Sequence, residues 1–97
     1  MLATPTILIC LPTLLETDIG EGAAEARTKY LKLGANTEAI NYLGLPSVSV
    51  NCGLDPNGLP IGISFIGRPF AEDTVLKLAD AYQQETDWHE RRPPVLA

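Results

Sequence analysis

The sequence predicts an α/β chain, in which a small, mainly antiparallel sheet carries flanking helices. Three observations support this fold class. Residues 47–50 and 61–67 are rich in β-branched and apolar residues and flank a turn-rich stretch, which is typical of a β-hairpin. Residues 23–33 and 72–85 are rich in helix formers and space their apolar residues along one helix face. A third apolar, β-branched segment, residues 2–10, opens the chain.

The opening segment, residues 2–10, is predicted to be a strand. Its Pro5 lacks a backbone N–H, so it is best tolerated at a sheet edge or near the start of the strand. A strand that is apolar at successive positions is expected to be covered on both faces. Residues 12–22 contain two glycines and no stable period, so we expect a loop there.

Two helices are expected next. The first covers residues 23–33 and has Gly34 in the C-cap position; its apolar face is formed by Ala26, Tyr30 and Leu33. The second is short, covers residues 38–43, and can be capped by Asn36 or Thr37. It should stop at Gly44, because Pro46 follows two residues later.

The strongest local prediction is a hairpin followed by a helix. Residues 47–50 alternate small polar and β-branched residues, and the turn-rich stretch at 52–60 includes the dipeptide Asn57-Gly58. Residues 61–67 form the second strand. The last helix begins near Glu72, whose negative charge suits a helix N-terminus, and an irregular tail follows it.

Composition excludes several function classes. The net charge is −5, and no cluster of Lys and Arg suggests a nucleic-acid surface. The longest apolar run, residues 7–15, is broken by Pro12 and is too short to span a membrane. No segment has the features of a signal peptide, so the expected location is the cytoplasm. There Cys10 and Cys52 would stay reduced and pack as small hydrophobic residues. No residue pattern implies a metal site or any other cofactor.

The common catalytic motifs are absent. No Gly-x-Ser-x-Gly, dinucleotide-binding loop or phosphate-binding loop occurs, and the serines of the two hairpin strands are interpreted as ordinary strand residues. The single histidine, His89, is expected to be a surface residue. An independent hydrolase that pairs His89 with Cys10 or Cys52 remains an open alternative, because sequence does not give their separation.

Two blocks carry a family resemblance: residues 41–55, NYLGLPSVSVNCGLD, and residues 58–70, GLPIGISFIGRPF. They resemble the closing part of the amidase signature family, which has an Asn-x-x-Gly-x-Pro junction, a Gly-Leu-Pro-x-Gly strand and a Gly-Arg-Pro-Phe-x-Glu helix start. The start of the chain, LATPT, is similar to the family's Leu-x-x-Pro-Thr strand, and Thr86-Asp87-Trp88-His89 is similar to its final segment. The resemblance is colinear over nearly the whole chain and is weakest at residues 13–32.

The resemblance implies an enzyme that cuts amides, or takes ammonia from glutamine, with a Ser–cis-Ser–Lys triad. That triad belongs to a Gly- and Ser-rich signature upstream of every residue here, so no catalytic residue is carried over. The strands are expected to join the edge region of a large mixed sheet. The resemblance also places the substrate-binding cleft wall at Asn36, Thr37, Asn41 and Gly44.

Two positions depart from the family pattern. Asn51 stands where the family usually has proline, which restores a backbone donor and is expected to loosen the turn. Glutamine-using members usually have Asp three residues before a Thr in this region; here Gly34 takes the place of the Asp, and Thr37 is kept. This difference weighs against glutamine as the substrate of the parent enzyme.

Residues 1–97 are therefore interpreted as a single partial domain, the C-terminal segment of an amidase, without its triad and inactive alone. The alternative is a stand-alone module that self-associates or docks on an upstream amidase segment. The first interpretation follows from the resemblance and the absent triad. The alternative follows from size, because three strands and three helices rarely cover both faces of a sheet in so small a chain. The expected partners are a second copy or the upstream amidase segment.

Overall fold

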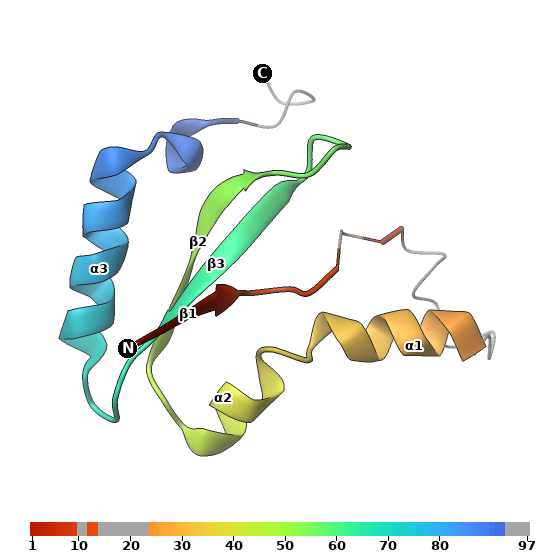
Figure 1. Cartoon of the computed structure of the whole chain (residues 1–97), viewed down its shortest axis with the longest axis horizontal. Coiled ribbons are helices and arrows are strands. Elements are labelled where there is room, and N and C mark those ends of the chain that lie inside the picture. Colours follow the sequence, from red (N-terminus) through yellow and green to blue (C-terminus); the bar gives the residue numbers. More distant parts are fainter. Residues whose placement is uncertain (10–11, 14–23, 93–97) are drawn as a thin grey trace.

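The computed structural model describes residues 1–9, 12–13 and 24–92. The elements follow the predicted order of strand, helix, short helix, two strands and helix (Figure 1). Their bounds are β1 Leu2–Pro5, α1 Ala24–Leu33, α2 Glu38–Leu43, β2 Ser47–Leu54, β3 Pro60–Ile66, α3 Glu72–Glu85 and the 3-10 turn η3 Trp88–Glu90. The α/β class with a small antiparallel sheet and flanking helices is confirmed. The loop expected at 12–22 lies almost entirely outside the described residues.

The three strands form one antiparallel sheet in the order β1-β3-β2. The hairpin strands β2 and β3 pair with Ser47 opposite Ile66, and β1 pairs with the other side of β3 with Leu2 opposite the same Ile66. The first and second strands are therefore both edge strands, and β1 is held by a partner more than half the chain away. Pro5 lies at an edge, as predicted.

The first strand is shorter than predicted, because it ends at Pro5 instead of residue 10. One further bond, from the Thr6 N–H to the Gly62 carbonyl at 3.0 Å, continues the pairing. In the same register Leu8 would face Pro60, which has no N–H to donate, and β3 itself starts there. The ladder therefore ends because its partner strand offers no donor. Cys10 lies outside the described residues.

The expected cover on both faces of β1 was also wrong for this chain. Leu2 is 62% exposed, and Ala3 and Pro5 are exposed as well. Ala3 and Pro5 are on the sheet face that α3 covers, but this helix packs on β2 and β3 and leaves them exposed. Leu2 is on the opposite face of the sheet.

The hairpin turn is organised by the carboxylate of Asp55. Its Oδ1 accepts hydrogen bonds from the backbone N–H of Asn57 at 2.8 Å and of Leu59 at 2.9 Å. The side chain is 7% exposed, and its other oxygen, Oδ2, is buried with no partner among the described residues. Gly58 has a φ of 80°, which favours glycine, so the predicted Asn57-Gly58 turn is confirmed.

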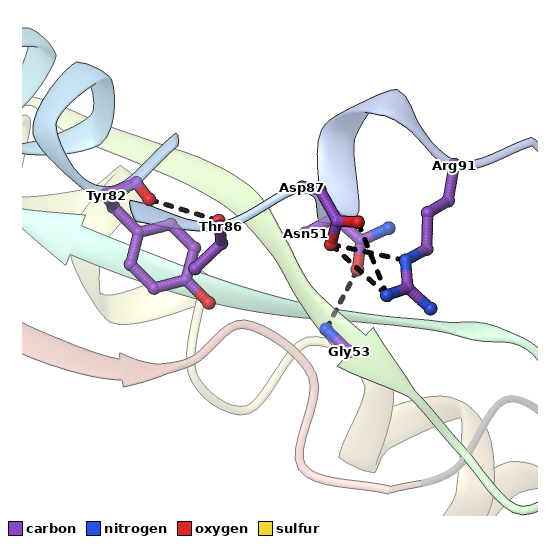
Figure 2. Close-up of polar contacts among 6 residues, drawn as sticks. All are labelled: Asn51, Gly53, Tyr82, Thr86, Asp87 and Arg91. Carbon is purple, nitrogen blue, oxygen red and sulfur yellow. Dashed lines mark hydrogen bonds and ion pairs between the residues drawn. The ribbon is translucent and has the colours of Figure 1, made fainter. Parts of the chain in front are cut away.

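Asn51 lies inside β2 and not in the turn, which corrects the expected loosening. The register shifts between Asn51 and Gly53, which marks a β-bulge. The Asn51 Oδ1 accepts a bond from the Gly53 N–H at 3.0 Å (Figure 2). The side chain thus supports the bulge, a role that proline could not have.

The core lies between one sheet face and α3. Val50 and Phe65 pack with Ala79 of this helix, and Val48, Ile63 and Tyr82 are partly buried against them. The rings of Phe65 and Tyr82 meet edge-to-face with centroids 5.9 Å apart. The predicted last helix is confirmed, and this face of the hairpin is the one it covers.

The chain after α3 is held by local contacts (Figure 2). The Thr86 hydroxyl donates to the Tyr82 carbonyl at 3.0 Å. The Arg91 guanidinium bonds the Asp87 carboxylate at 3.2 Å and lies 4.3 Å from the Trp88 ring centroid. The segment expected to be irregular therefore contains the short turn η3, which contacts β2.

The two earlier helices differ from expectation mainly in their caps. Thr37 is at the N-cap of α2, but its hydroxyl donates to the Gly34 carbonyl at 3.2 Å, and no side chain caps the helix. Gly44 ends α2 with a φ of 69°, as predicted. Gly34, in contrast, has no positive φ, so it is not a left-handed C-cap of α1. The side chains of Ala26 and Tyr30, expected on the α1 face, lie outside the described residues.

Candidate functional site

The sheet face opposite α3 carries hydroxyl groups from all three strand segments. Ser49 and Ser64 are directly opposite each other on β2 and β3. The Thr6 Oγ1, just after β1, lies 2.6 Å from the Ser49 Oγ and 2.7 Å from the Ser64 Oγ. Gly62 makes room for this cluster, because a Cβ there would lie 2.9 Å from the Ser49 Oγ. The cluster holds β1 to the hairpin on this face.

A small open pocket of about 60 Å³ lies beside this cluster. Its walls come from the segment that leads into α2, from α2 itself and from the paired ends of the hairpin strands. The lining residues are Asn36, Thr37, Ile40, Asn41, Ser47, Ser64 and Ile66. Three of the four predicted cleft-wall residues therefore meet in one pocket. Gly44 does not line it and is exposed at the end of α2.

The α2 segment is tied to the sheet through Asn36. Its Nδ2 donates to the Pro5 carbonyl at 2.7 Å, across 31 positions of sequence. At the other end of the helix, Gly44 turns the chain toward Pro46 and the start of β2. These two connections hold the polar side of α2 over the sheet face that carries Ser47, Ser49 and Ser64.

Sequence reasoning missed the contribution of Ser47 and Ser64, which it treated as ordinary strand residues. The signal was present in the Ser-Val-Ser-Val alternation, which places Ser47 and Ser49 on one face. Ser64 is 7% exposed and Ile66 is 4% exposed, so these two are the most buried lining residues. The sequence could not show that α2 would lie over them.

The pocket is polar but uncharged. No lining residue is ionisable, and its side chains offer amide and hydroxyl groups that can both donate and accept. The Ser64 hydroxyl is bonded to Thr6, another hydroxyl, which is not a base that could activate a nucleophile. The arrangement suits binding of a neutral polar group such as a carboxamide, and it has no nucleophile–base pair among its lining residues.

The Cys-His alternative gains no geometric support in the described residues. Cys52 is a half-buried free thiol on β2. The charged neighbour of His89 is Glu90, with Nε2 and Oε1 3.8 Å apart. The other thiol of this hypothesis, Cys10, lies outside the described residues, so that pairing stays a prediction.

Neither a metal centre nor a membrane span is found in the described part of the chain. It contains no group of three or more His, Cys, Asp or Glu side chains that could hold a metal ion. Within the same residues, every helix is too short or too polar to cross a bilayer.

Comparison with known proteins gives a consistent result. The family model named Amidase matches residues 1–76. The chain is 47% identical over 79 residues to a glutamyl-tRNA(Gln) amidotransferase subunit of Methanosarcina mazei, a match that covers 81% of this chain and 16% of the relative. It is 45% identical over 93 residues to the protein of the same name from Chloroflexus aggregans, covering 96% of this chain and 18% of the relative. No solved structure matches.

The chain thus spans less than a fifth of the length of these relatives. The family model nevertheless matches most of the chain and includes the cleft-wall positions and the hairpin. On these grounds, the chain belongs to the amidase family.

Proposed function

We propose that this chain is the C-terminal segment of an amide-processing enzyme and forms one wall of its substrate cleft. In this proposal Asn36, Thr37 and Asn41 contact the substrate, and Gly44 shapes the approach. The observation that supports it best is the uncharged pocket, which brings the first three of these residues together with Ser64. Carboxamides donate and accept hydrogen bonds without carrying charge, so their chemistry matches this lining.

The proposal also holds that the chain lacks the Ser–cis-Ser–Lys triad and is inactive alone. Two observations support this part. The relatives are several times longer than the matched region. The hydroxyls of Thr6, Ser49 and Ser64 are bonded to one another, and no lysine side chain that the structure describes bonds them. The cytoplasmic location is part of the same proposal.

The first test is ammonia release from a panel of simple amides and from glutamine. The chain alone should give no release above the buffer blank. A chimera in which this chain replaces the matching segment of the Methanosarcina mazei relative should release ammonia. An isolated chain that turns over an amide, at a rate proportional to its own concentration across purifications, would overturn the proposal.

The role of the pocket is tested in the same chimera. Asn41→Ala should lower kcat/KM at least about tenfold, because one buried hydrogen bond to a substrate is worth about 1.4 kcal/mol or more. The control is Leu76→Ala, an exposed position of α3 away from the pocket, which should leave kcat/KM unchanged. Equal activity of Asn41→Ala and the control would remove Asn41 from the binding site.

A second candidate function is a stand-alone module that self-associates. It is favoured by large apolar side chains that stay exposed in the described residues, among them Tyr42 at 90%, Leu43 at 63% and Phe70 at 94%. Light scattering behind a sizing column tests it. A closed oligomer at micromolar concentration would favour the module, whereas a monomer would favour the segment of a larger enzyme.

A further inference from the structure

We infer that the outer edge of β2 is the docking edge of this chain, and that it accepts a β-strand from the remaining part of an amidase-family enzyme. This inference rests on the proposed function and adds to it the surface by which the segment joins its enzyme. The sheet order β1-β3-β2 leaves two edge strands, β1 and β2. They differ in how many outward-facing backbone N–H and C=O groups they offer to a further strand.

The direction of the backbone groups follows from the pairing. In an antiparallel ladder, alternate residues point both N–H and C=O at the same neighbour. The Gly67 N–H donates to the Pro46 carbonyl at 2.9 Å, so Pro46 points inward, toward β3. Val48 and Val50 then point inward as well. The backbone groups of Ser47 and Ser49 must point outward, and no backbone bond between described residues reaches them.

On the opposite edge, the direction of the β1 backbone groups also follows from the pairing with β3. The Thr6 N–H bonds the Gly62 carbonyl, so Thr4 points toward β3, while Ala3 and Pro5 point outward. Pro5 has no N–H to donate. Its carbonyl already accepts bonds from the Asn36 Nδ2 at 2.7 Å and the Thr4 hydroxyl at 3.2 Å. Within β1, only Ala3 then offers both an outward-facing N–H and an outward-facing C=O to a new strand. One such residue is too few for a further strand to pair with this edge, which we call blocked.

The first half of the β2 edge has none of these protections. The whole strand is eight residues long and contains no proline and no charged residue. Natural edge strands usually avoid pairing through charge, proline, bulges or short length. The bulge of β2 lies at Asn51 to Gly53, beside the segment from Thr86 to Arg91 in Figure 2. The half with Ser47 and Ser49 is therefore the part open to a new strand.

The occupant follows from the relatives, which contain more than four fifths of their length outside the matched region. Strand addition supplies main-chain hydrogen bonds along such an edge and suits a missing neighbour in the same sheet.

Amide hydrogen exchange measured by NMR tests the inference directly. In the chain alone, the Val48 and Val50 amides should exchange slowly and those of Ser47 and Ser49 rapidly. The probe is the Methanosarcina mazei relative without its matching segment. Adding it should slow exchange at Ser47 and Ser49 at least tenfold and leave the Ala3 amide unchanged.

Three results would overturn the inference. They are protection of Ala3 without protection of Ser49, no binding of the probe, and concentration-dependent protection of Ser49 in the chain alone, which would make a second copy the occupant.

The chimera assay separates failure of this inference from failure of the proposed function. An active chimera with an unprotected Ser49 removes the docking edge alone, whereas an inactive chimera removes the enzyme assignment whatever the exchange pattern.

A matched pair of variants gives an independent measurement. Ser49→Pro removes the outward N–H but spares the β2–β3 ladder, and Ser49→Ala removes the same hydroxyl while keeping that N–H. Binding of the probe should weaken at least tenfold in Ser49→Pro relative to Ser49→Ala. Ala3→Pro, the equivalent change on the blocked edge, should bind like the unaltered chain. Slow exchange at Val48 and Val50 in each variant shows that the hairpin is intact, and equal binding by both Ser49 variants would contradict the inference.

Discussion

At the scale of single residues, Asp55 has the largest structural effect in the hairpin turn. Its Oδ1 satisfies two backbone donors, from Asn57 and Leu59, and the group is 7% exposed. A turn-forming sequence at 55–58 predicted the turn, but it did not predict that one carboxylate would be buried to organise it. Residue type gives the local preference, whereas burial depends on what packs over the turn.

Asp55→Ala should therefore lower the free energy of unfolding by about 2 kcal/mol, because two N–H groups of the turn lose their acceptor. Urea denaturation followed by circular dichroism measures the change. Asn57→Ala is the control: it keeps the backbone N–H that bonds Asp55, is exposed, and should change the free energy by less than about 0.5 kcal/mol. Equal effects of the two variants would show that the carboxylate is not the organising group.

Thr6 is the second residue with a specific role, because its hydroxyl joins Ser49 and Ser64. Thr6→Val keeps the shape and leaves the buried Ser64 hydroxyl without this partner, so it should destabilise the chain by about 1–2 kcal/mol. Thr6→Ser restores the hydroxyl and should recover most of the loss. A similar loss in both variants would mean that the methyl group, and not the hydroxyl, holds β1 in place.

At the scale of elements, α3 stabilises the hairpin by covering its apolar face. Val75 is 3% exposed on this helix, whereas Leu76, the next residue, is 59% exposed. Val75→Ala should lower the unfolding midpoint in urea, with a loss of about 1–3 kcal/mol from the removed methyl groups and the cavity left behind. Leu76→Ala should leave the midpoint nearly unchanged, and a larger effect at Leu76 than at Val75 would mean that a different face of the helix is buried.

The elements also show how far sequence reasoning extends. The bounds 72–85 of the last helix and 38–43 of the short helix were predicted correctly, since both have local signals in acidic first turns or a glycine stop. The first strand was overextended by five residues because its end is set by Pro60, which lies on a different strand. The family resemblance identified three of the residues that line the pocket: Asn36, Thr37 and Asn41. Ser64 was not, because its contribution depends on tertiary contact.

At the scale of the whole molecule, the chain has a core on one sheet face and a polar pocket on the other. Large apolar side chains stay exposed in the described residues, among them Leu2 at 62% and Tyr42 at 90%. Domains normally enclose a sheet with a second layer of helices or another sheet. The arrangement is consistent with a segment whose remaining cover is supplied by more polypeptide.

The pairing of Leu2 with Ile66 has a consequence for the order of folding. The hairpin strands and α3 are neighbours in sequence and can assemble with little loss of loop entropy, whereas joining β1 to β3 closes a loop of more than 60 residues. A ribosome makes the first strand before its partner exists. This pairing therefore cannot form until β3 has been made. β1 is then the last of the three strands to add to this sheet.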